Sequence, residues 1–274
     1  MPDLYAVIGN PIAQSKSPYI HARFAETAGQ DMVYRALEAP RDGFAARIDA
    51  FRREGGRGLN VTTPFKLDAF AYATDRSKRA RLAGAVNAMK FEGDQVFAEN
   101  FDGVGLVADI VRNIGFPIEG RRILLLGAGG AARGAIEPLL CANPAALVVA
   151  NRTPATAEAL AAEFVGVGAV RAVSYFDLET LSSFDIVVNA TSASLRGELP
   201  AVPANVFAPH ALAYDMVYGR GLTPFLRVAG AAGAGQLADG VGMLVEQAAE
   251  AFAWWRGVRP ETAPVITGLM KPLV

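Results

Sequence analysis

Several residue types and patterns are scarce in this chain of 274 residues, and each scarcity excludes a class of protein. Cys141 is the only cysteine, which excludes an intramolecular disulfide framework and a CxxC-type metal or redox motif. His21 and His210 are the only histidines, so a zinc site built from histidines is not expected and we predict no metal. The formal net charge of −1 provides no global positive field to hold nucleic acid or an anionic membrane.

Long apolar runs are also missing. The first residues, Met1-Pro2-Asp3-Leu4, lack the basic region and apolar stretch of a signal peptide. The run between Arg121 and Ala128 contains Ile-Leu-Leu-Leu but reaches glycine after the length of one strand, well short of a membrane span. These observations predict a soluble, cytoplasmic protein. Its partners are expected to be small molecules rather than nucleic acid or a membrane, and a monomer or homodimer is the expected working state.

The residues that are present favour a folded α/β protein with two domains. Hydrophobic residues make up 52 % of the chain, enough for sizeable cores, and 274 residues exceed what one core usually holds. Short apolar runs alternate with helical patterns, and from residue 103 onward this alternation is typical of a parallel sheet with right-handed crossovers. Residues 83–91 and 95–98 are expected to form a hairpin around Gly93-Asp94.

One short sequence occurs twice. Asp102-Gly-Val-Gly-Leu and Asp239-Gly-Val-Gly-Met each open a predicted helix, on either side of the alternating segment. We interpret the two helices as crossings between domains, although two unrelated N-capping aspartates would look the same. The predicted domains are residues 1–102, residues 103–237 and a C-terminal segment, 238–274, that packs back on the first domain.

A glycine-rich turn carries the strongest chemical signal. Gly127-Ala128-Gly129-Gly130-Ala131-Ala132 fits G-x-G-x-x-A and lies between a predicted strand and a predicted helix. Glycines permit a sharp turn and let a pyrophosphate approach the helix N-terminus, whose free N–H groups favour an anion. A tight strand-to-helix turn without a ligand is the alternative.

The end of the next strand indicates which dinucleotide binds. An NAD site usually has an acidic residue about 20 residues after the glycines, where it bonds the ribose 2′-hydroxyl. Here Asn151-Arg152-Thr153 offers no acid, and arginine suits a 2′-phosphate. The sequence therefore favours NADP over NAD, unless Arg152 is only a solvated residue at the end of a strand.

Two further clusters are polar. Ser15 and Ser17 lie two residues apart at a helix start, where they can hold a carboxylate, or where Ser17 can simply be an N-cap. Lys66 follows Asn60-Val-Thr-Thr-Pro-Phe, and Asp102 starts a helix. A lysine beside a carboxylate can catalyse proton transfer, but taken singly each residue could equally be a surface lysine or an N-cap.

Together these residues resemble the shikimate dehydrogenase family over nearly the whole chain. The ordered motifs are residues 5–18, 60–66, Gly84-Ala-Val-Asn87, Asn100-Phe-Asp-Gly-Val-Gly, 127–131, Asn151-Arg-Thr, Asn189-Ala-Thr, 214–218 and 238–247. The resemblance implies an N-terminal α/β substrate domain, a Rossmann-like domain for NADP, and a C-terminal helix that returns to the first domain. It also implies the reduction of 3-dehydroshikimate to shikimate with NADPH.

The resemblance assigns roles to particular positions. Lys66 and Asp102 would be the catalytic pair, and Ser15 and Ser17 would hold the substrate carboxylate. The rest of the substrate site would comprise Asn60, Thr62, Asn87, Asp102, Tyr218 and Gln247. The cofactor would contact Gly127, Ala128, Gly129, Gly130, Ala131, Asn151, Arg152 and Thr153, with Ala190, Thr191, Met216 and Gly240 near the nicotinamide.

The chain departs from the family pattern at three places. Phe101 replaces a usual threonine, residues 154–156 lack a second arginine that often follows Arg152, and Ser194 replaces a glycine. We expect Phe101 to reshape the substrate pocket, or else to turn away and fill the core. These departures leave two alternatives open: a dehydrogenase that prefers quinate or another cyclic hydroxy acid, and a ligand-binding relative with weak catalysis.

Overall fold

The computed structural model describes residues 2–193, 198–199, 202–219 and 221–273. The chain folds into two compact units. The first unit comprises Met1–Gly105 and Val245–Thr267, and the second comprises Leu106–Leu244 and Gly268–Val274. The chain passes from one unit to the other within helix α5 (Asp102–Ala108), within helix α9 (Val241–Arg256) and again near the end of helix α10 (Ala263–Leu269). The predicted bounds 1–102, 103–237 and 238–274 stay predictions.

The first unit is built on a six-stranded mixed sheet in the order β2-β1-β3-β5-β6-β4. Its strands are β1 (Asp3–Gly9), β2 (Met32–Glu38), β3 (Gly56–Val61), β4 (Asp75–Arg76), β5 (Ala88–Glu92) and β6 (Gln95–Glu99). Its other helices are α1 (Ser17–Thr27), α2 (Phe44–Arg53), α3 (Lys66–Tyr72), α4 (Lys78–Ala83) and α10 (Ala263–Leu269). Strands β1, β2 and β3 are parallel, whereas β5 pairs antiparallel with β3 and β6.

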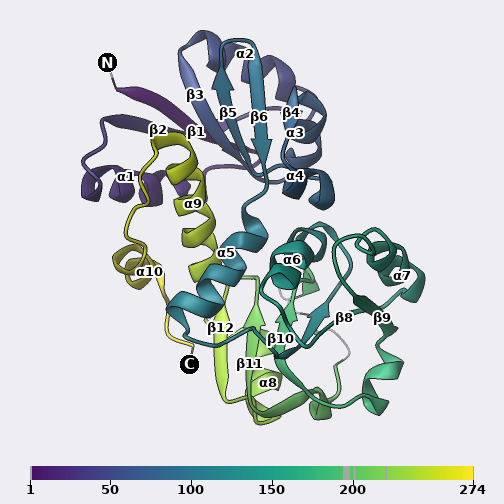
Figure 1. The fold of residues 1–274 in the computed structure, drawn as a ribbon. Coiled ribbons are helices and arrows are strands. Elements are labelled where there is room, and N and C mark those ends of the chain that lie inside the picture. The colour runs from purple at the N-terminus through teal and green to yellow at the C-terminus, as the bar shows by residue number, and fades with distance from the viewer. Residues whose placement is uncertain (1, 194–197, 200–201, 220, 274) are drawn as a thin grey trace. The chain divides into compact units, whose positions relative to one another are not determined.

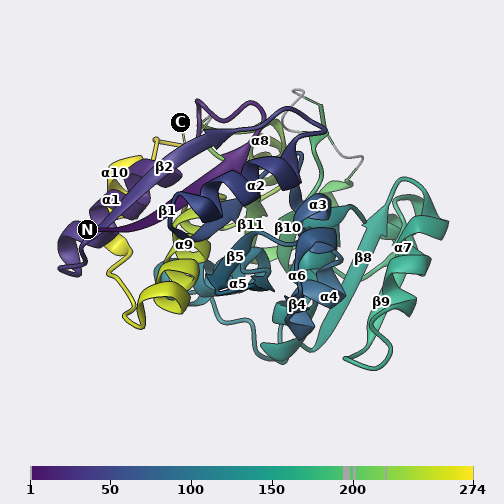
Figure 2. The same ribbon diagram turned by 90° about the horizontal axis from the view of Figure 1, so that it is seen from above.

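Strand β1 separates two cores because its side chains alternate between the faces of the sheet. Leu4, Ala6 and Ile8 join the aliphatic and phenylalanine cluster of α2 and α3. Tyr5 faces the other way and stacks on Trp255 of α9, with ring centroids 4.8 Å apart. Figure 2 shows α2 across one face of this sheet and α9 at the other. The C-terminal helix therefore returns to the first unit, as predicted.

The second unit is a parallel six-stranded sheet in the order β12-β11-β10-β7-β8-β9 (Figure 1). Its strands are β7 (Arg122–Leu126), β8 (Ala146–Asn151), β9 (Val170–Ser174), β10 (Phe184–Asn189), β11 (Phe207–Asp215) and β12 (Gln236–Asp239). Helices α6 (Gly130–Cys141) and α7 (Pro154–Ala162) follow β7 and β8, and α8 (Pro224–Ala231) follows β11. Short helical turns are η1 (Asp109–Asn113), η2 (Phe176–Thr180) and η4 (Ala204–Val206). This strand order, with the chain reversing between β7 and β10, is that of a doubly wound dinucleotide-binding sheet, which confirms the predicted Rossmann-like fold.

Burial explains why the strands of the second sheet are so apolar. Ile123 to Leu126 of β7 and Ile186 to Val188 of β10 have no exposed side-chain surface, because helices cover both faces of a parallel sheet. Such strands are continuous hydrophobic runs rather than alternating ones, which is how the sequence revealed them.

Several local predictions need correction. Ser17 is the first residue of α1 and does not cap it, since Lys16 occupies the N-cap position. The predicted strand at residues 83–91 begins only at Ala88, because Gly84 ends helix α4 with φ +61°. The hairpin itself is confirmed, with Glu92 opposite Gln95. The helix that is predicted to open at Asp102 changes at Asp109 into a wider π-helical turn. Within the described ranges, no helix has both the length and the apolar character needed to cross a bilayer.

Candidate active site

Lys66 and Asp102 meet in the first unit. Lys66 begins α3 directly after the turn that follows β3, and Asp102 begins α5. The Lys66 ammonium Nζ donates a hydrogen bond to Asp102 Oδ2 over 2.5 Å. Both side chains are partly buried, with exposed fractions of 33 % and 20 %, so the pair is reachable from solvent but only weakly screened by it. A substrate hydroxyl at this pair would find a proton donor and acceptor held together.

Asn87 organises the groups around that pair. Its Nδ2 donates to Asp102 Oδ1 over 2.8 Å and to Gln247 Oε1 over 3.1 Å. Its Oδ1 accepts from the Phe101 backbone N–H over 2.8 Å. Asn87 and Gln247 are buried, and an amide whose donors and acceptor are all engaged cannot turn without breaking a bond. Asp102 is thereby held with one oxygen on Asn87 and the other on Lys66.

The other predicted substrate residues of this unit lie on β3 and around the start of α1. Asn60, on β3, donates from Nδ2 to the backbone carbonyl of Asn87 over 3.3 Å. The Ser15 hydroxyl accepts from the Ser17 backbone N–H over 3.3 Å, and Ser17 is buried. Thr62 follows β3, and its backbone N–H bonds the Ile8 carbonyl. Tyr218 belongs to the second unit, where its ring is 41 % exposed.

The second unit contains a cavity of about 920 Å³ at the carboxyl ends of its strands. The glycine-rich turn forms part of its wall: Gly127 has φ +101°, and an added Cβ there would come within 3.0 Å of Thr191 Cγ2. At Gly129 and Gly130 an added Cβ would meet nothing within 4 Å, so the backbone in front of α6 is open to a ligand. Ala132, the last residue of the motif, is fully buried against the sheet. This geometry fits a pyrophosphate at a helix N-terminus.

Most of the predicted cofactor residues line this cavity. The lining includes Gly127, Ala128, Gly129, Gly130, Ala131, Asn151, Arg152, Ala190 and Thr191. Thr153, Met216 and Gly240 are not part of the lining. Gly240 packs so tightly that a Cβ would come within 2.3 Å of the Met216 carbonyl oxygen, which accounts for a glycine there without any ligand. Ser194 lies outside the described residues.

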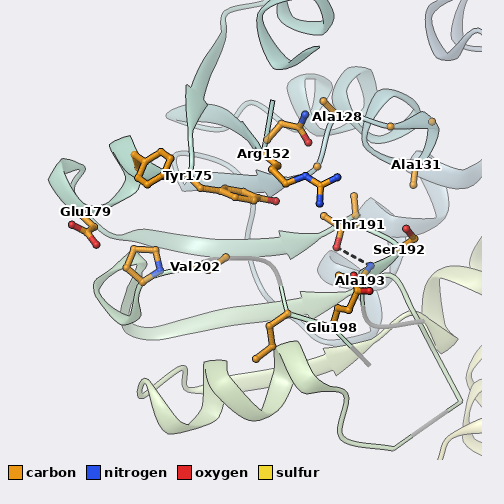
Figure 3. Close-up of a pocket in the computed structure, with 18 residues that line it drawn as sticks. Ala128, Ala131, Arg152, Tyr175, Glu179, Thr191, Ser192, Ala193, Glu198 and Val202 are labelled. Carbon is orange, nitrogen blue, oxygen red and sulfur yellow. Dashed lines mark hydrogen bonds between the residues drawn. The ribbon is translucent and has the colours of Figure 1, made fainter. Parts of the chain in front are cut away.

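One end of the cavity combines a cation with aromatic rings. Figure 3 shows Arg152 beside Tyr175, and Arg152 is the single basic residue among the described residues of the lining. Burial raises the pKa of Tyr175, and the Arg152 charge opposes that rise. Phe176 also lines the cavity, with 91 % of its side chain exposed. Sequence analysis missed both aromatic residues, although two adjacent aromatic residues just after a predicted strand were a readable signal.

Phe101 turns away and fills the core, which is the second of the two interpretations given above. Its side chain is 4 % exposed and belongs to an aromatic cluster with Tyr5 and Trp255. Its ring meets Trp254 edge to face, with centroids 5.8 Å apart. The ring therefore fills the core of the first unit, while its backbone N–H donates to a predicted site residue, Asn87.

His21 and Tyr34 are further residues that sequence analysis passed over. His21 Nε2 lies 3.1 Å from Asn60 Oδ1, and the Tyr34 hydroxyl donates to the same oxygen over 2.7 Å. A buried histidine on the apolar face of a helix gives no signal of such a contact, since it is read as part of the core. Within the described residues, no group of three or more histidine, cysteine, aspartate or glutamate side chains could hold a metal ion.

The sheet order, the glycine cradle and the separate lysine–aspartate pair define a class: two-domain α/β proteins with a Rossmann-like second domain. Three family models match consecutive parts of the chain. They describe the shikimate dehydrogenase substrate binding domain (residues 7–89), shikimate / quinate 5-dehydrogenase (109–196) and the shikimate 5'-dehydrogenase C-terminal domain (240–267). The chain belongs to the shikimate dehydrogenase family.

Individual relatives match over the full length. The shikimate dehydrogenase (NADP(+)) of Nitrosospira multiformis is 56 % identical over 273 residues, which cover 100 % of this chain and 99 % of that protein. The crystal structure of an Ael1 enzyme from Pseudomonas putida is 57 % identical, with a TM-score of 0.96 over 99 % of this chain and 100 % of that one. The shikimate 5-dehydrogenase of Thermus thermophilus, in complex with NADP(H) and shikimate, is 34 % identical, with a TM-score of 0.86 over 97 % and 98 % of the two chains.

Proposed function

We propose that this protein is an NADP-dependent shikimate dehydrogenase that interconverts shikimate and 3-dehydroshikimate, as an oxidoreductase acting on a CH–OH group in aromatic amino-acid biosynthesis. The observation that carries the proposal is the Lys66–Asp102 pair, with Nζ and Oδ2 at 2.5 Å. It is joined by full-length similarity to proteins that are named for this activity.

The residues of the second unit fit the cofactor. The open backbone at Gly129 and Gly130 would receive the pyrophosphate, and Arg152 would face the 2′-phosphate as a charge-assisted donor. Asn151 and Thr153 would contact the same end, whereas Ala190, Thr191, Met216 and Gly240 would lie toward the nicotinamide. A bound nicotinamide cofactor would supply the hydride chemistry at the substrate carbinol carbon, so the protein itself would have one proton to handle.

That proton is the task of Lys66 and Asp102. Oxidation of a carbinol to a ketone releases the hydroxyl proton as the hydride leaves, and an unprotonated Lys66 Nζ takes it up. In the reverse direction the Lys66 ammonium returns the proton to the developing alkoxide, which keeps atoms and charge balanced. Asp102 orients Lys66 and stabilises its positive form, and Asn87 keeps the Asp102 carboxylate in place.

The remaining polar residues would bind the substrate. Ser15 and Ser17 would hold the carboxylate, and the rest of the ring would meet Asn60, Thr62, Asn87, Tyr218 and Gln247. Hydroxyls and amides suit a small polyhydroxylated acid, because each substrate oxygen then exchanges its water for a directed hydrogen bond. A cytoplasmic location, and a monomer or homodimer as the working state, are further predictions for localisation and size-exclusion experiments.

The direct test is NADPH formation from shikimate, followed by absorbance with the purified protein. Turnover with shikimate and NADP+ is expected, with lower kcat/KM for quinate and for NAD+. A higher kcat/KM for quinate would instead favour a quinate-type dehydrogenase. Binding of shikimate without turnover of either acid would mark a ligand-binding relative.

A further inference from the structure

His21 is a buried titratable residue that takes no part in the mechanism above. It lies on α1 of the first unit, four residues after Ser17 and therefore on the same helix face, and its ring is fully buried. Four aromatic rings surround it: Tyr34 stacked at a centroid distance of 4.1 Å, and Phe24, Trp255 and Phe252 between 5.5 and 6.2 Å. Among the described residues, its Nδ1 has no hydrogen-bond partner.

The orientation of the Asn60 amide follows from its neighbours. The Asn87 backbone carbonyl can only accept, so the Asn60 atom 3.3 Å from it is the nitrogen Nδ2. The amide oxygen Oδ1 then faces the Tyr34 hydroxyl and His21 Nε2. Both lone pairs of Oδ1 are engaged, and one of the two Nδ2 hydrogens is held by the Asn87 carbonyl. The second N–H of Nδ2 is then the hydrogen-bonding capacity that Asn60 can offer to a ligand.

The tautomer of His21 follows in turn. Nε2 faces an oxygen that can only accept, so Nε2 carries the hydrogen. The other neutral tautomer would set two lone pairs against each other and also bury an unpaired N–H, which costs two penalties. Burial lowers the pKa of His21 to about 3, so the ring stays neutral.

We propose that His21 and Tyr34 are positioning residues that hold the Asn60 amide with its second N–H toward the substrate, so that Asn60 selects a hydrogen-bond acceptor on the bound hydroxy acid. This inference rests on the proposed function. Tyr34 also lies beside a second predicted substrate ligand: burial raises the pKa of Tyr34 well above its ordinary value, and the neighbouring Ser17 side chain opposes that rise. The serine and asparagine from different segments thus share one aromatic support.

The first experiment leaves His21, Tyr34 and Asn60 unchanged. Long-range ¹H–¹⁵N spectra of the ¹⁵N-labelled protein contain two imidazole systems, because the chain has two histidines. His210→Asn, at an exposed site in the second unit, assigns them. We expect one neutral ring with hydrogen on Nε2 that stays unchanged between pH 8 and about 5, one unit or more above the pKa of about 3. A ring protonated on Nδ1, or charged at pH 7, would overturn the proposal whether or not the protein turns over shikimate.

The second experiment separates substrate recognition from catalysis. His21→Phe keeps the ring and removes the donor, and Tyr34→Phe keeps the stack and removes the hydroxyl. Each is expected to raise the KM and the dissociation constant for shikimate about tenfold, with kcat changed less than threefold and NADP+ affinity unchanged. His21→Gln, which restores an N–H, should recover most of the loss. Shikimate binding within twofold of wild type in both phenylalanine variants would overturn the proposal, whereas absence of turnover in the wild type would overturn only the proposed function.

Discussion

The two proposed binding regions differ in the groups that they offer to a ligand, which are side chains in the first unit and backbone in the second. In the first unit, side chains from four separate segments, around residues 66, 87, 102 and 247, hold one another by hydrogen bonds. In the second unit, one continuous turn offers bare backbone at Gly129 and Gly130. A network of side chains can direct a proton and select among ring hydroxyls, whereas a backbone cradle binds whatever carries a pyrophosphate. Catalysis and substrate choice are therefore expected to depend on the first unit, and cofactor affinity on the second.

Removing the lysine should have the largest effect. Lys66→Ala deletes the proposed proton carrier, and such groups contribute about 10²–10⁴-fold in rate. We expect kcat to fall by that factor, with a much smaller change in shikimate KM and none in NADP+ affinity. Steady-state kinetics and calorimetry measure these quantities. Lys90→Ala, which removes a lysine paired with Glu92 on the same sheet, is the matched control. A folded Lys66→Ala protein with near-normal kcat would exclude the role.

Lowering the pH should reduce the unfolding free energy through the buried histidine of the first unit, His21. The folded-state pKa of His21 is about 3 against 6.5 in the unfolded chain, so between these values only the unfolded chain takes up the proton. The stabilisation is present above pH 6.5 and is lost as the pH falls toward 3, by about 1.4 kcal/mol per pH unit. Between pH 6.5 and 4.5 the wild type should lose about 2 kcal/mol more unfolding free energy than His21→Gln.

Urea denaturation at the two pH values measures that difference. His210→Asn is the matched control, since this exposed histidine lies in the other unit. Equal acid sensitivity of wild type and His21→Gln would contradict the prediction, because it would show that His21 takes up a proton in the folded protein despite its burial.

The affinity for NADP+ should depend on the charge of one residue, Arg152. Arg152→Ala removes the single cation among the described residues of the cavity lining. A hydrogen bond to a charged group is worth roughly 1.5–3 kcal/mol, and the exposed position of Arg152 favours the low end, so NADP+ should bind about tenfold more weakly. NAD+ lacks the 2′-phosphate and should bind as before. Calorimetric titration of the variant with NADP+ and with NAD+ measures both affinities, and Arg171→Ala is the control. Equal weakening of the two cofactors would contradict the assignment of Arg152 to the 2′-phosphate.

The same contrast explains what the sequence could predict. The parallel sheet and its glycine turn are encoded in continuous runs, such as Ile123–Leu126 followed by Gly127, so local patterns were sufficient. The side-chain network was accessible only through family resemblance, because nothing local relates Asn87 to Gln247, 160 residues away. Phe101 kept two interpretations for the same reason, because the aromatic core that it fills is formed with Trp254, which is distant in the sequence. Helix α3 was missed because a short helix after a proline turn has too few residues to show a period.

The smallest effect concerns an aromatic residue that no motif announced. Phe176 lines the cavity near Arg152 and Tyr175 with 91 % of its side chain exposed, so folding gains little from it. A base stacked on an aromatic ring is worth about 1–3 kcal/mol, and a ring open to water on most sides should contribute no more than the lower value. Phe176→Ala should therefore weaken NADP+ and NAD+ alike, by about threefold to fivefold, because both carry the same adenine. Val165→Ala, at an exposed position (80 %) outside this cavity, is the control for lost apolar surface. Calorimetry with the two cofactors separates this pattern from that of Arg152→Ala, and a loss confined to NADP+ would mean that Phe176 acts by supporting the arginine rather than by contacting the base.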